Sequence, residues 1–449
     1  MKNRAYRIEA GTLALCVFFW AVVSHADRRS SLSGNLLIPD ADDVFIYPQL
    51  AMHYADSVSF DIVAPSLEEA PARPGAATLV MRYEDTWAFG ISGHRGDFYG
   101  ATAHAFTGYG DIALYTGGDG RVATLNTISE ASSLPPGISS EFADRLLAPD
   151  DFLDIFGAYQ MGSGVVGARL SVGISKASED TFGETFDTKL RRSADVVDMV
   201  VGYSHRDETL AWDTNLELST AAIRVDASAG VGDLEQRVIG ELSRPASVAM
   251  SGRLWMDLKD AWSLGVLAVG GFTKYGVDQE LRGTSEYLEY DASTYLVEIG
   301  GGIVYEVPTK TIVSGYITLG SQWRWSVQEN PADEDGLVNR VEDRSAVYMF
   351  PSFKLALEHW ITDWLCIRGG SQAKFFGQTD STTVEDPIEP DTTRTYSSTT
   401  TRAFFGIGLR YEGLEFSGTF QDGMMVEGPH LLSGKDGGLF VLTNLAYRF

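Results

Sequence analysis

The sequence predicts an antiparallel transmembrane β-barrel. Three observations lead to this fold: side chains alternate between apolar and polar in many segments, these segments are long, and short connections alternate with long ones. In such a barrel the apolar side chains face lipid and the polar ones face the lumen. The 449 residues are 44% hydrophobic, yet the mean hydropathy is only −0.06. A large apolar surface is therefore expected without a series of apolar helices.

The alternation is clearest in residues 438–449, at the C-terminus. One face carries Leu439, Val441, Thr443, Leu445, Tyr447 and Phe449, and the other carries Phe440, Leu442, Asn444, Ala446 and Arg448. A strand places alternate side chains on opposite sides, so one face of this strand is apolar. A final strand of alternating aromatics that ends in Phe449 resembles the assembly signal of bacterial outer-membrane proteins. The resemblance implies that the barrel-assembly machinery is a partner.

The same alternation recurs along the chain, in residues 166–174, 210–218, 295–306, 402–411 and 414–421. These segments span about 10 to 15 residues, whereas strands of globular proteins average about 5 or 6. A tilted strand that crosses a membrane needs about 9–11 residues. The chain is expected to form about 16 strands, with roughly 14–18 compatible and an even number required by two periplasmic termini. Residues 95–115 and 221–243 leave the number open, because strands and loop hairpins look alike there.

The connections between segments give independent support. Short turns are predicted at Arg206-Asp207, Lys259-Asp260, Pro308-Thr309, Ile361-Thr362 and Glu412-Gly413. Long polar connections are predicted over residues 176–192, 275–291, 326–343, 377–400 and 422–436. Outer-membrane barrels have short periplasmic turns and long extracellular loops. The C-terminus is therefore expected on the periplasmic side. Residues 95–150 are expected to form a long loop or an inserted plug element, with a short helix over residues 139–147.

The N-terminus has the layout of a secretory signal peptide. Lys2, Arg4 and Arg7 precede an apolar run over residues 11–23, and the small-x-small sequence Ser24-His25-Ala26 follows. The run is shorter than the about 20 residues that a membrane helix needs, although an uncleaved anchor is the alternative. We expect residues 1–26 to be a signal peptide, residues 27–57 a periplasmic or hatch segment, and residues 58–449 the barrel. The expected location is the outer membrane of a Gram-negative-type cell.

A short stretch within the N-terminal segment resembles a known family. Residues 42–51 (DDVFIYPQLA) resemble the acidic–aromatic–Asn-Pro-Ala segment of FadL-type and PorV-type outer-membrane proteins, with Tyr47 in place of the asparagine. In that family the segment packs inside the barrel as a hatch. The resemblance implies that Phe45, Tyr47 and Pro48 are hatch residues. A disordered leader before the first strand is the other interpretation.

Charge and motifs exclude several functional classes. The chain has 61 acidic and 35 basic residues, a net charge of −26, which excludes nucleic-acid binding. Cys16 lies in the signal peptide, so Cys366 has no intrachain disulfide partner. Neither a P-loop nor a G-x-S-x-G motif occurs, and the histidines lack metal-like spacing. We expect no enzyme activity, no cofactor and no metal site. Calcium binding by the acidic loops stays open, although residues 331–336 do not match the EF-hand spacing.

Charged side chains within the segments must point into the lumen, because facing lipid at mid-depth costs about 2–4 kcal/mol each. The candidates for lumen-facing residues are Arg253, Glu298, Arg324, Lys354, Arg368, Lys374, Arg402, Arg410 and Arg448. Strands after residue 321 contribute mostly bases, opposite a more acidic first half. These charges either create a field that selects polar solutes or pair with one another.

Two local features complete the expected barrel. Aromatic residues near strand ends, among them Trp262, Tyr305, Trp323 and Trp325, are expected to form girdles at the membrane boundaries. Pro351 lies inside a predicted strand and cannot donate to the ladder, so a bulge or break is expected there.

The predicted function is an outer-membrane channel or passive transporter for small molecules, surrounded by outer-membrane lipid and lipopolysaccharide. The hatch resemblance implies hydrophobic solutes, whereas the charged lumen favours polar ones. The first alternative is a structural or surface-interaction barrel with a plugged lumen and acidic extracellular loops. A soluble periplasmic propeller is the second alternative.

Overall fold

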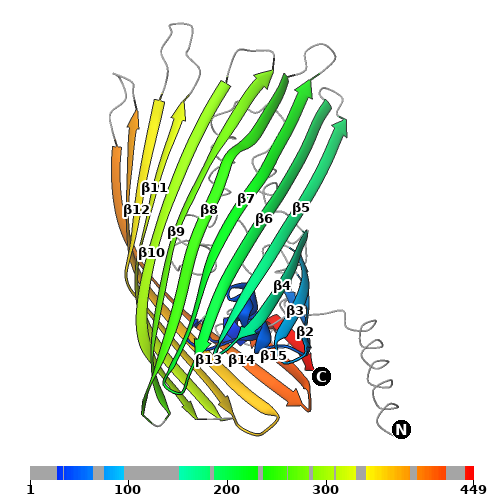
Figure 1. Cartoon of the computed structure of the whole chain (residues 1–449). Coiled ribbons are helices and arrows are strands. Elements are labelled where there is room, and N and C mark those ends of the chain that lie inside the picture. The colour runs from blue at the N-terminus through cyan, green and yellow to red at the C-terminus, as the bar shows by residue number, and fades with distance from the viewer. Residues whose placement is uncertain are drawn as a thin grey trace, which may run out of the picture.

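The described residues form a closed barrel of sixteen antiparallel strands in which β1 pairs with β16 (Figure 1). The computed structural model describes residues 28–33, 35–63, 75–95, 151–182, 187–230, 236–259, 261–282, 287–307, 310–329, 340–384, 392–420 and 440–449. The fold class and the strand number predicted from the sequence are confirmed. The predicted signal peptide, most of residues 95–150 with their candidate helix, and residues 422–436 lie outside the described residues.

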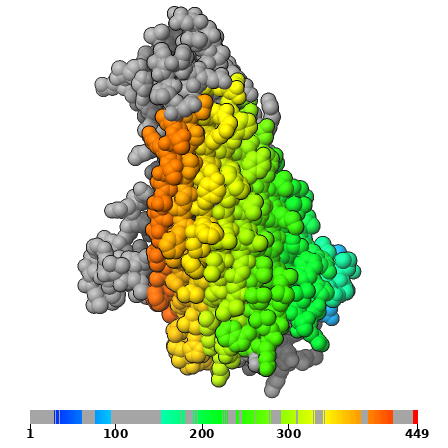
Figure 2. All heavy atoms as spheres, turned by 90° about the vertical axis from the view of Figure 1, so that its left-hand side faces the viewer, coloured from blue at the N-terminus to red at the C-terminus, as the bar shows by residue number. Residues whose placement is uncertain are grey.

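The strands follow one another around the barrel in sequence order. Their bounds are β1 (Ser57–Val63), β2 (Gly75–Tyr83), β3 (Trp87–Arg95), β4 (Asp151–Met161), β5 (Gly164–Phe182), β6 (Asp187–Arg206), β7 (Leu210–Gly230), β8 (Gln236–Lys259), β9 (Trp262–Arg282), β10 (Tyr287–Val307), β11 (Thr311–Glu329), β12 (Arg340–Trp360), β13 (Leu365–Val384), β14 (Thr392–Tyr411), β15 (Leu414–Phe420) and β16 (Phe440–Arg448). In the space-filling view, β8 to β14 form one continuous outer wall (Figure 2). Within the described residues, no helix is long and apolar enough to cross a bilayer.

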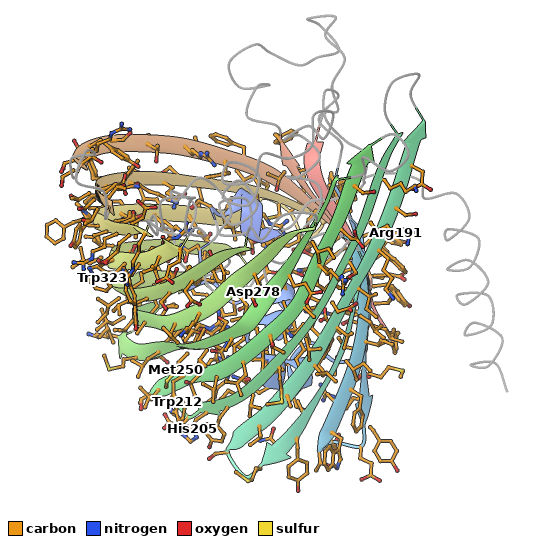
Figure 3. The ribbon with its side chains drawn as sticks, turned by 90° about the horizontal axis from the view of Figure 1, so that it is seen from above. Arg191, His205, Trp212, Met250, Asp278 and Trp323 are labelled. Carbon is orange, nitrogen blue, oxygen red and sulfur yellow. The ribbon has the colours of Figure 1, made fainter. Side chains whose placement is uncertain are left out.

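The apolar rows face outward, as predicted. On β10 the side chains of Tyr295, Val297 and Ile299 are more than half exposed, whereas Leu296 and Glu298 between them are buried. The same alternation holds on the neighbouring strands, and Trp323 and Met250 project from the outer side of the sheet (Figure 3). An exposed apolar belt of this kind meets hydrocarbon, so the barrel spans a membrane.

Two groups of outward-facing aromatic residues mark the edges of the apolar belt. At one level, Trp87 lies 4.4 Å from Tyr159 and Trp262 lies 4.7 Å from Tyr305, measured between ring centroids. The other level contains Tyr295, Trp323, Trp325 and Tyr348. On β10, Tyr305 is ten positions along the strand from Tyr295. At a rise of about 3.3–3.4 Å per residue and a tilt of about 35–45°, this spacing corresponds to about 25 Å, the height of a lipid-facing band.

The end of the barrel that carries Tyr305 has the short connections, and we call it the turn end. Two to four residues join β2 to β3, β4 to β5, β6 to β7, β8 to β9, β10 to β11, β12 to β13 and β14 to β15 there. All five turns predicted from the sequence fall in this set. In the β6–β7 turn, the Asp207 carboxylate accepts hydrogen bonds from the backbone N–H groups of Thr209 and Leu210, which lower the pKa of Asp207.

The connections at the far end correct the sequence prediction. Strands β5 to β14 contain 19–24 residues, so β5 and β6 occupy most of the predicted loop over residues 176–192, and β9 and β10 most of residues 275–291. Strand also covers parts of residues 326–343 and much of residues 377–400. The prediction was wrong because polar composition was taken as a sign of loops. Outside the membrane both faces of a strand can meet water, so a polar strand is stable there.

The predicted irregularity at Pro351 is confirmed. The registers of β12 shift between Thr318 and Gly320 on β11 and between Met349 and Ser352 on β12. A proline has no N–H for the ladder, and a bulge moves it out of the pairing pattern.

The position of the apolar belt predicts a depth-dependent cost of a charge on the outer face. Ile299→Arg, midway between the two aromatic levels, should lower the free energy of unfolding by about 2–4 kcal/mol, whereas Ser293→Arg, beyond Tyr295, should change it by at most about 1 kcal/mol. The free energy is measured by denaturant titration in lipid vesicles. Equal costs at the two positions would show that the belt is misplaced.

Candidate functional site: a plugged lumen

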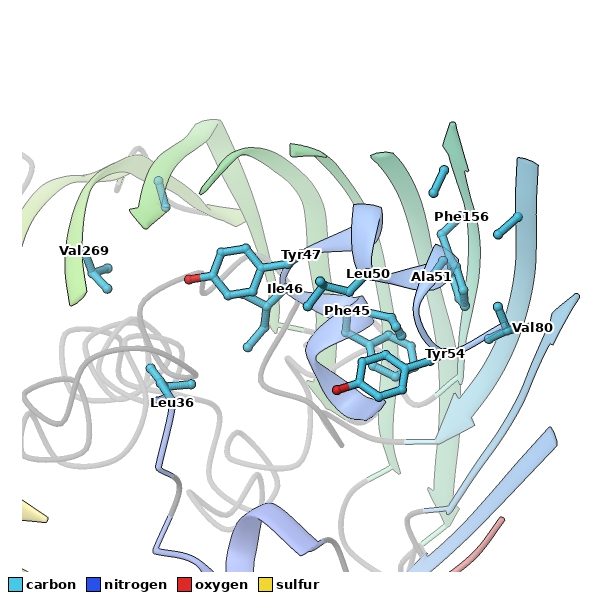
Figure 4. Packing of buried hydrophobic residues seen from close by; sticks show 14 of the residues in the cluster. Leu36, Phe45, Ile46, Tyr47, Leu50, Ala51, Tyr54, Val80, Phe156 and Val269 are labelled. Carbon is cyan, nitrogen blue, oxygen red and sulfur yellow. The ribbon is translucent and has the colours of Figure 1, made fainter. Parts of the chain in front are cut away.

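The N-terminal segment folds inside the barrel near the turn end (Figure 1), and its apolar side chains pack against the strands of the wall (Figure 4). Residues 28–33 and 35–56, which we call the plug, contain helix α2 (Arg28–Ser31) and the 3₁₀ helices η1 (Ala41–Phe45) and η2 (Pro48–Met52). Leu50 and Ala51 of η2 are almost fully buried in a cluster that includes Phe156 of β4. The plug therefore fills part of the lumen with an apolar core of its own.

The sequence around η1 and η2 explains their local shape. Asp40 accepts a hydrogen bond from the N–H of Asp42, and the Asp43 carboxylate accepts one from the N–H of Asp40, so the two acids form a capping box. Such a box satisfies two N–H groups that have no partner within a helix. Pro48 occupies the first position of η2, where its missing N–H costs nothing.

The three hatch candidates from the sequence lie in this plug. Phe45 is 2% exposed, and its ring lies edge-on to Phe156 at a centroid distance of 6.0 Å. Tyr47 is equally buried, and its hydroxyl oxygen lies 3.1 Å from the Ser251 hydroxyl. Pro48 is buried at the start of η2. All three side chains thus lie between the plug and the barrel wall, although their role in transport stays a prediction.

Glycines on the lumen face allow the plug to approach the wall closely. A Cβ at Gly167 would overlap the backbone of Pro48 and Gln49. A Cβ at Gly370 would lie 2.8 Å from the backbone nitrogen of Ser33, which is also too close. Glycine at these two positions therefore leaves room for the backbone of the plug.

Arg253 of β8 fastens the middle of the plug to the wall. Its Nη1 lies 2.6 Å from the Asp43 carboxylate and donates to the Leu36 carbonyl oxygen at 3.0 Å, and its Nε donates to Asp213 of β7 at 2.9 Å. The guanidinium also lies 4.5 Å from the ring centroid of Tyr47. Charge, hydrogen bonding and ring contact therefore converge on one buried side chain.

A second buried arginine fastens the η1–η2 junction. Arg169 of β5 forms an ion pair with Asp198 of β6 and donates to the carbonyl oxygen of Phe45. Nearby, the Asn215 side-chain amide donates to the carbonyl oxygen of Ile46 at 2.5 Å. Side chains of the wall thus satisfy plug carbonyls that the short 3₁₀ helices leave without partners.

Arg368 of β13 organises a third group, on the opposite part of the wall. It donates to Glu358 at 2.8 Å and to the Ser417 hydroxyl at 2.6 Å. Arg28 of the plug donates to the same Glu358 at 2.6 Å and lies 3.2 Å from Asp40. The Glu358 carboxylate therefore links the first residues of the plug to β12 and β13.

The remaining lumen-facing candidates occupy varied positions. Glu298, Lys354 and Lys374 are buried, and Arg324 is half-buried with its Nη2 3.5 Å from the Tyr275 hydroxyl. Arg402, Arg410 and Arg448 are exposed. Arg410 nevertheless pairs with Glu415 at 3.0 Å. Among the nine candidates, Arg253 contacts the plug directly, Arg368 shares Glu358 with Arg28, and the Arg448 guanidinium lies 5.9 Å from the ring centroid of Tyr54 in the plug.

Several residues of this network were not singled out from the sequence as candidate site residues. They are the acidic residues Asp43 and Asp198, the plug partner Trp255 and the plug residue Arg28. Trp255 donates its indole N–H to the carbonyl oxygen of Leu37 at 3.0 Å. Alternation placed Asp213 on the lumen side of its strand, but no local pattern shows which inward residues meet the plug.

A cavity of about 500 Å³ lies between the plug and the wall formed by β14, β15, β16, β1 and β2. Arg28, Arg410 and Arg448 contribute guanidinium groups to its lining. The carboxylates of Asp40, Asp42, Glu358, Glu412 and Glu415 also line it. The plug thus leaves space beside the short strands, and charges of both signs surround that space.

The described residues contain no group of three or more His, Cys, Asp or Glu side chains arranged to hold a metal ion. Cys366 is buried and free.

No protein-family model matches the chain, and no curated protein sequence is significantly similar to it. Solved structures with similarity include the ferric yersiniabactin uptake receptor FyuA of Yersinia pestis, with a TM-score of 0.38, 8% identity and coverage of 81% of this chain and 67% of that one. The toluene transporter TodX of Pseudomonas putida has a TM-score of 0.33, 9% identity and coverage of 91% of both chains. The monoaromatic hydrocarbon channel CymD has a TM-score of 0.36 and 10% identity, with coverage of 85% of this chain and 98% of that one. Similarities of this size assign neither a family nor a substrate.

Removing the charge of Arg253 should loosen the plug. Arg253→Met removes the cation from the buried Asp43 and leaves Asp213 with only the partly exposed Arg206 at 3.5 Å, which should lower the free energy of unfolding by about 3–5 kcal/mol. Hydrogen exchange should accelerate in residues 36–50 before it does in the strands. Arg410→Met is the matched control, since its pair is exposed and contributes at most about 1 kcal/mol. Equal effects of the two changes would contradict the role of Arg253.

Filling the space at Gly167 should displace the plug. Gly167→Val forces side-chain atoms into the backbone of Pro48 and Gln49, so we expect a loss of about 1–3 kcal/mol. Gly301→Val is the control, because the nearest atom to its Cβ lies 3.7 Å away and the side chain faces outward. Limited proteolysis from the turn side, followed by mass spectrometry, should detect cleavage within the plug in the Gly167 variant only.

Proposed function

We propose that the chain is a passive channel of the outer membrane, in which the plug narrows the lumen and solutes pass beside it. The observation that carries the proposal is the charged cavity between the plug and β14–β16, β1 and β2. It lies on the side of the plug away from the contacts of η2 with β4, β5 and β6. A path there requires no break in the buried pairs of Arg253 and Arg169.

The chemistry of the cavity favours small polar solutes. Eight charged side chains line it, and covering them with a hydrophobic solute would remove their hydration without replacing it. A solute with charged or hydroxyl groups can exchange water for these side chains instead. Rings of charged residues select ions in other pores by the same principle. The charged lining of the cavity therefore favours polar solutes over the hydrophobic ones that the FadL resemblance implies.

The alternative function is a structural or surface-interaction barrel with a closed lumen. The observation in its favour is the number of buried contacts that hold the plug, among them the ion pairs of Arg253 and the salt bridge between Arg28 and Glu358. A plug fastened at so many points can seal a barrel. The two functions differ in whether water and ions cross the folded protein.

Conductance in planar bilayers separates the two functions. The channel should give a steady current, and Arg448→Glu should shift the reversal potential in a salt gradient toward cation selectivity. The shift has this direction because the substitution replaces a positive charge on the cavity lining with a negative one, which attracts cations. Passing ions come within about 8 Å, the Debye length, of that charge. Lys189→Glu, on the outer face far from the cavity, should leave selectivity unchanged. A correctly folded barrel that carries no current supports the alternative.

A further inference from the structure

A second site lies on the outside of the barrel, at the far edge of the apolar belt. A groove of about 440 Å³ crosses the outer faces of β10, β11, β12 and β13. Tyr295, Trp323 and Trp325 line it together with Arg344 and Ala346. Figure 3 shows Trp323 projecting away from the barrel on this side. The groove therefore opens on the outer side of the sheet, away from the plug.

Strand register gives the groove an aromatic wall and a floor of small side chains. Trp323 lies opposite Ala346, which lies opposite Thr379, and Trp325 lies opposite Arg344, which lies opposite Ser381. The two indoles are 41% and 47% exposed, and Tyr295 is 52% exposed. Large rings thus stand beside small residues, so a flat ring-shaped group can lie against the indole faces.

Glu342 holds the polar part of this groove in place. The Arg344 guanidinium lies 2.5 Å from the Glu342 carboxylate through Nη2 and donates to it through Nε at 2.6 Å. Trp325 also donates a side-chain hydrogen bond to Glu342, and these contacts, with Arg344 contributing most, lower the pKa of the carboxylate. A carboxylate acceptor and a guanidinium donor are thus fixed side by side at the edge of an exposed indole.

The surface on the membrane side of the groove is apolar. Val297, Ile317 and Leu319 face outward there, and Phe350 is 72% exposed. This surface continues into the belt that meets hydrocarbon. A ligand that reaches from the groove onto this surface must have a polar head and apolar chains, as membrane lipids do.

We propose that the groove binds the saccharide headgroup of a glycolipid in the outer leaflet, with its acyl chains on the apolar belt below. Sugar rings present C–H groups that pack on indole faces, and their hydroxyls can both donate to Glu342 and accept from Arg344. The headgroup of an ordinary phospholipid offers no such ring. The groove also lies at the depth where tryptophan prefers to sit, at the headgroup boundary.

The test compares lipid binding to the full-length barrel in detergent by native mass spectrometry. The probes are a lipopolysaccharide without O-antigen and, for comparison, phosphatidylglycerol. Wild type should bind the glycolipid in preference to the phospholipid. The double variant W323A/W325A should bind the glycolipid about tenfold more weakly, which corresponds to about 1.4 kcal/mol. The matched control W262A, which removes an exposed tryptophan at the turn end, should bind it as wild type does.

A second variant tests the polar pair without removing the aromatic wall. Glu342→Gln should reduce the preference for the glycolipid while leaving phosphatidylglycerol binding unchanged. Heat-modifiable migration on gels verifies that each variant is a folded barrel. Equal glycolipid binding by wild type and W323A/W325A, or equal affinity of wild type for the two lipids, would overturn the proposal. Because the readout is lipid retention, the result does not depend on whether the lumen conducts.

Discussion

Within hydrocarbon, every backbone N–H and C=O group must find a partner in the protein, and this requirement governs the structure. The sheet meets it by closing: Ser57 to Val63 of β1 pair with Arg448 to Leu442 of β16. An open edge at this depth would leave unsatisfied groups that cost several kcal/mol each. Once the sheet is closed, the two faces of each strand are assigned, one to lipid and one to the lumen.

The closed sheet in turn creates the problem that the plug solves. A ring of sixteen strands encloses more space than the side chains of its own wall can fill. The N-terminal segment enters that space and brings apolar residues such as Phe45 and Leu50, but its short 3₁₀ helices leave backbone carbonyls without partners. Inward-facing arginines of the wall supply the donors, and acids on neighbouring strands balance their charge. Plug and wall are therefore complementary in shape and in hydrogen bonding, and both depend on the inward face fixed by closure.

Much of the barrel could be predicted from the sequence because period-two alternation depends on each strand alone. Residues 295–305 show their lipid face without any knowledge of neighbouring strands, and turns such as Glu412-Gly413 are equally local. The lengths of the strands could not be predicted, because beyond the membrane the two faces of a strand no longer differ in polarity. The contacts of the plug could not be predicted either, because Arg253, Asp43 and Asp213 come together from three distant segments. Gly167 shows the same limit: its small size matters because of Pro48 and Gln49.

The part of the sheet that rises beyond the apolar belt has a different relation to its sequence. On β14, residues 392–399 are exposed on both faces and consist only of threonine, serine, tyrosine and arginine. Side chains in this region contact neither lipid nor a packed interior. A substitution there needs only to keep the β-propensity of the strand and the solubility of the protein. Sequences of this region can therefore diverge far more freely than those of the belt. Related barrels would keep the same apolar belt while differing in the polar strand segments beyond it.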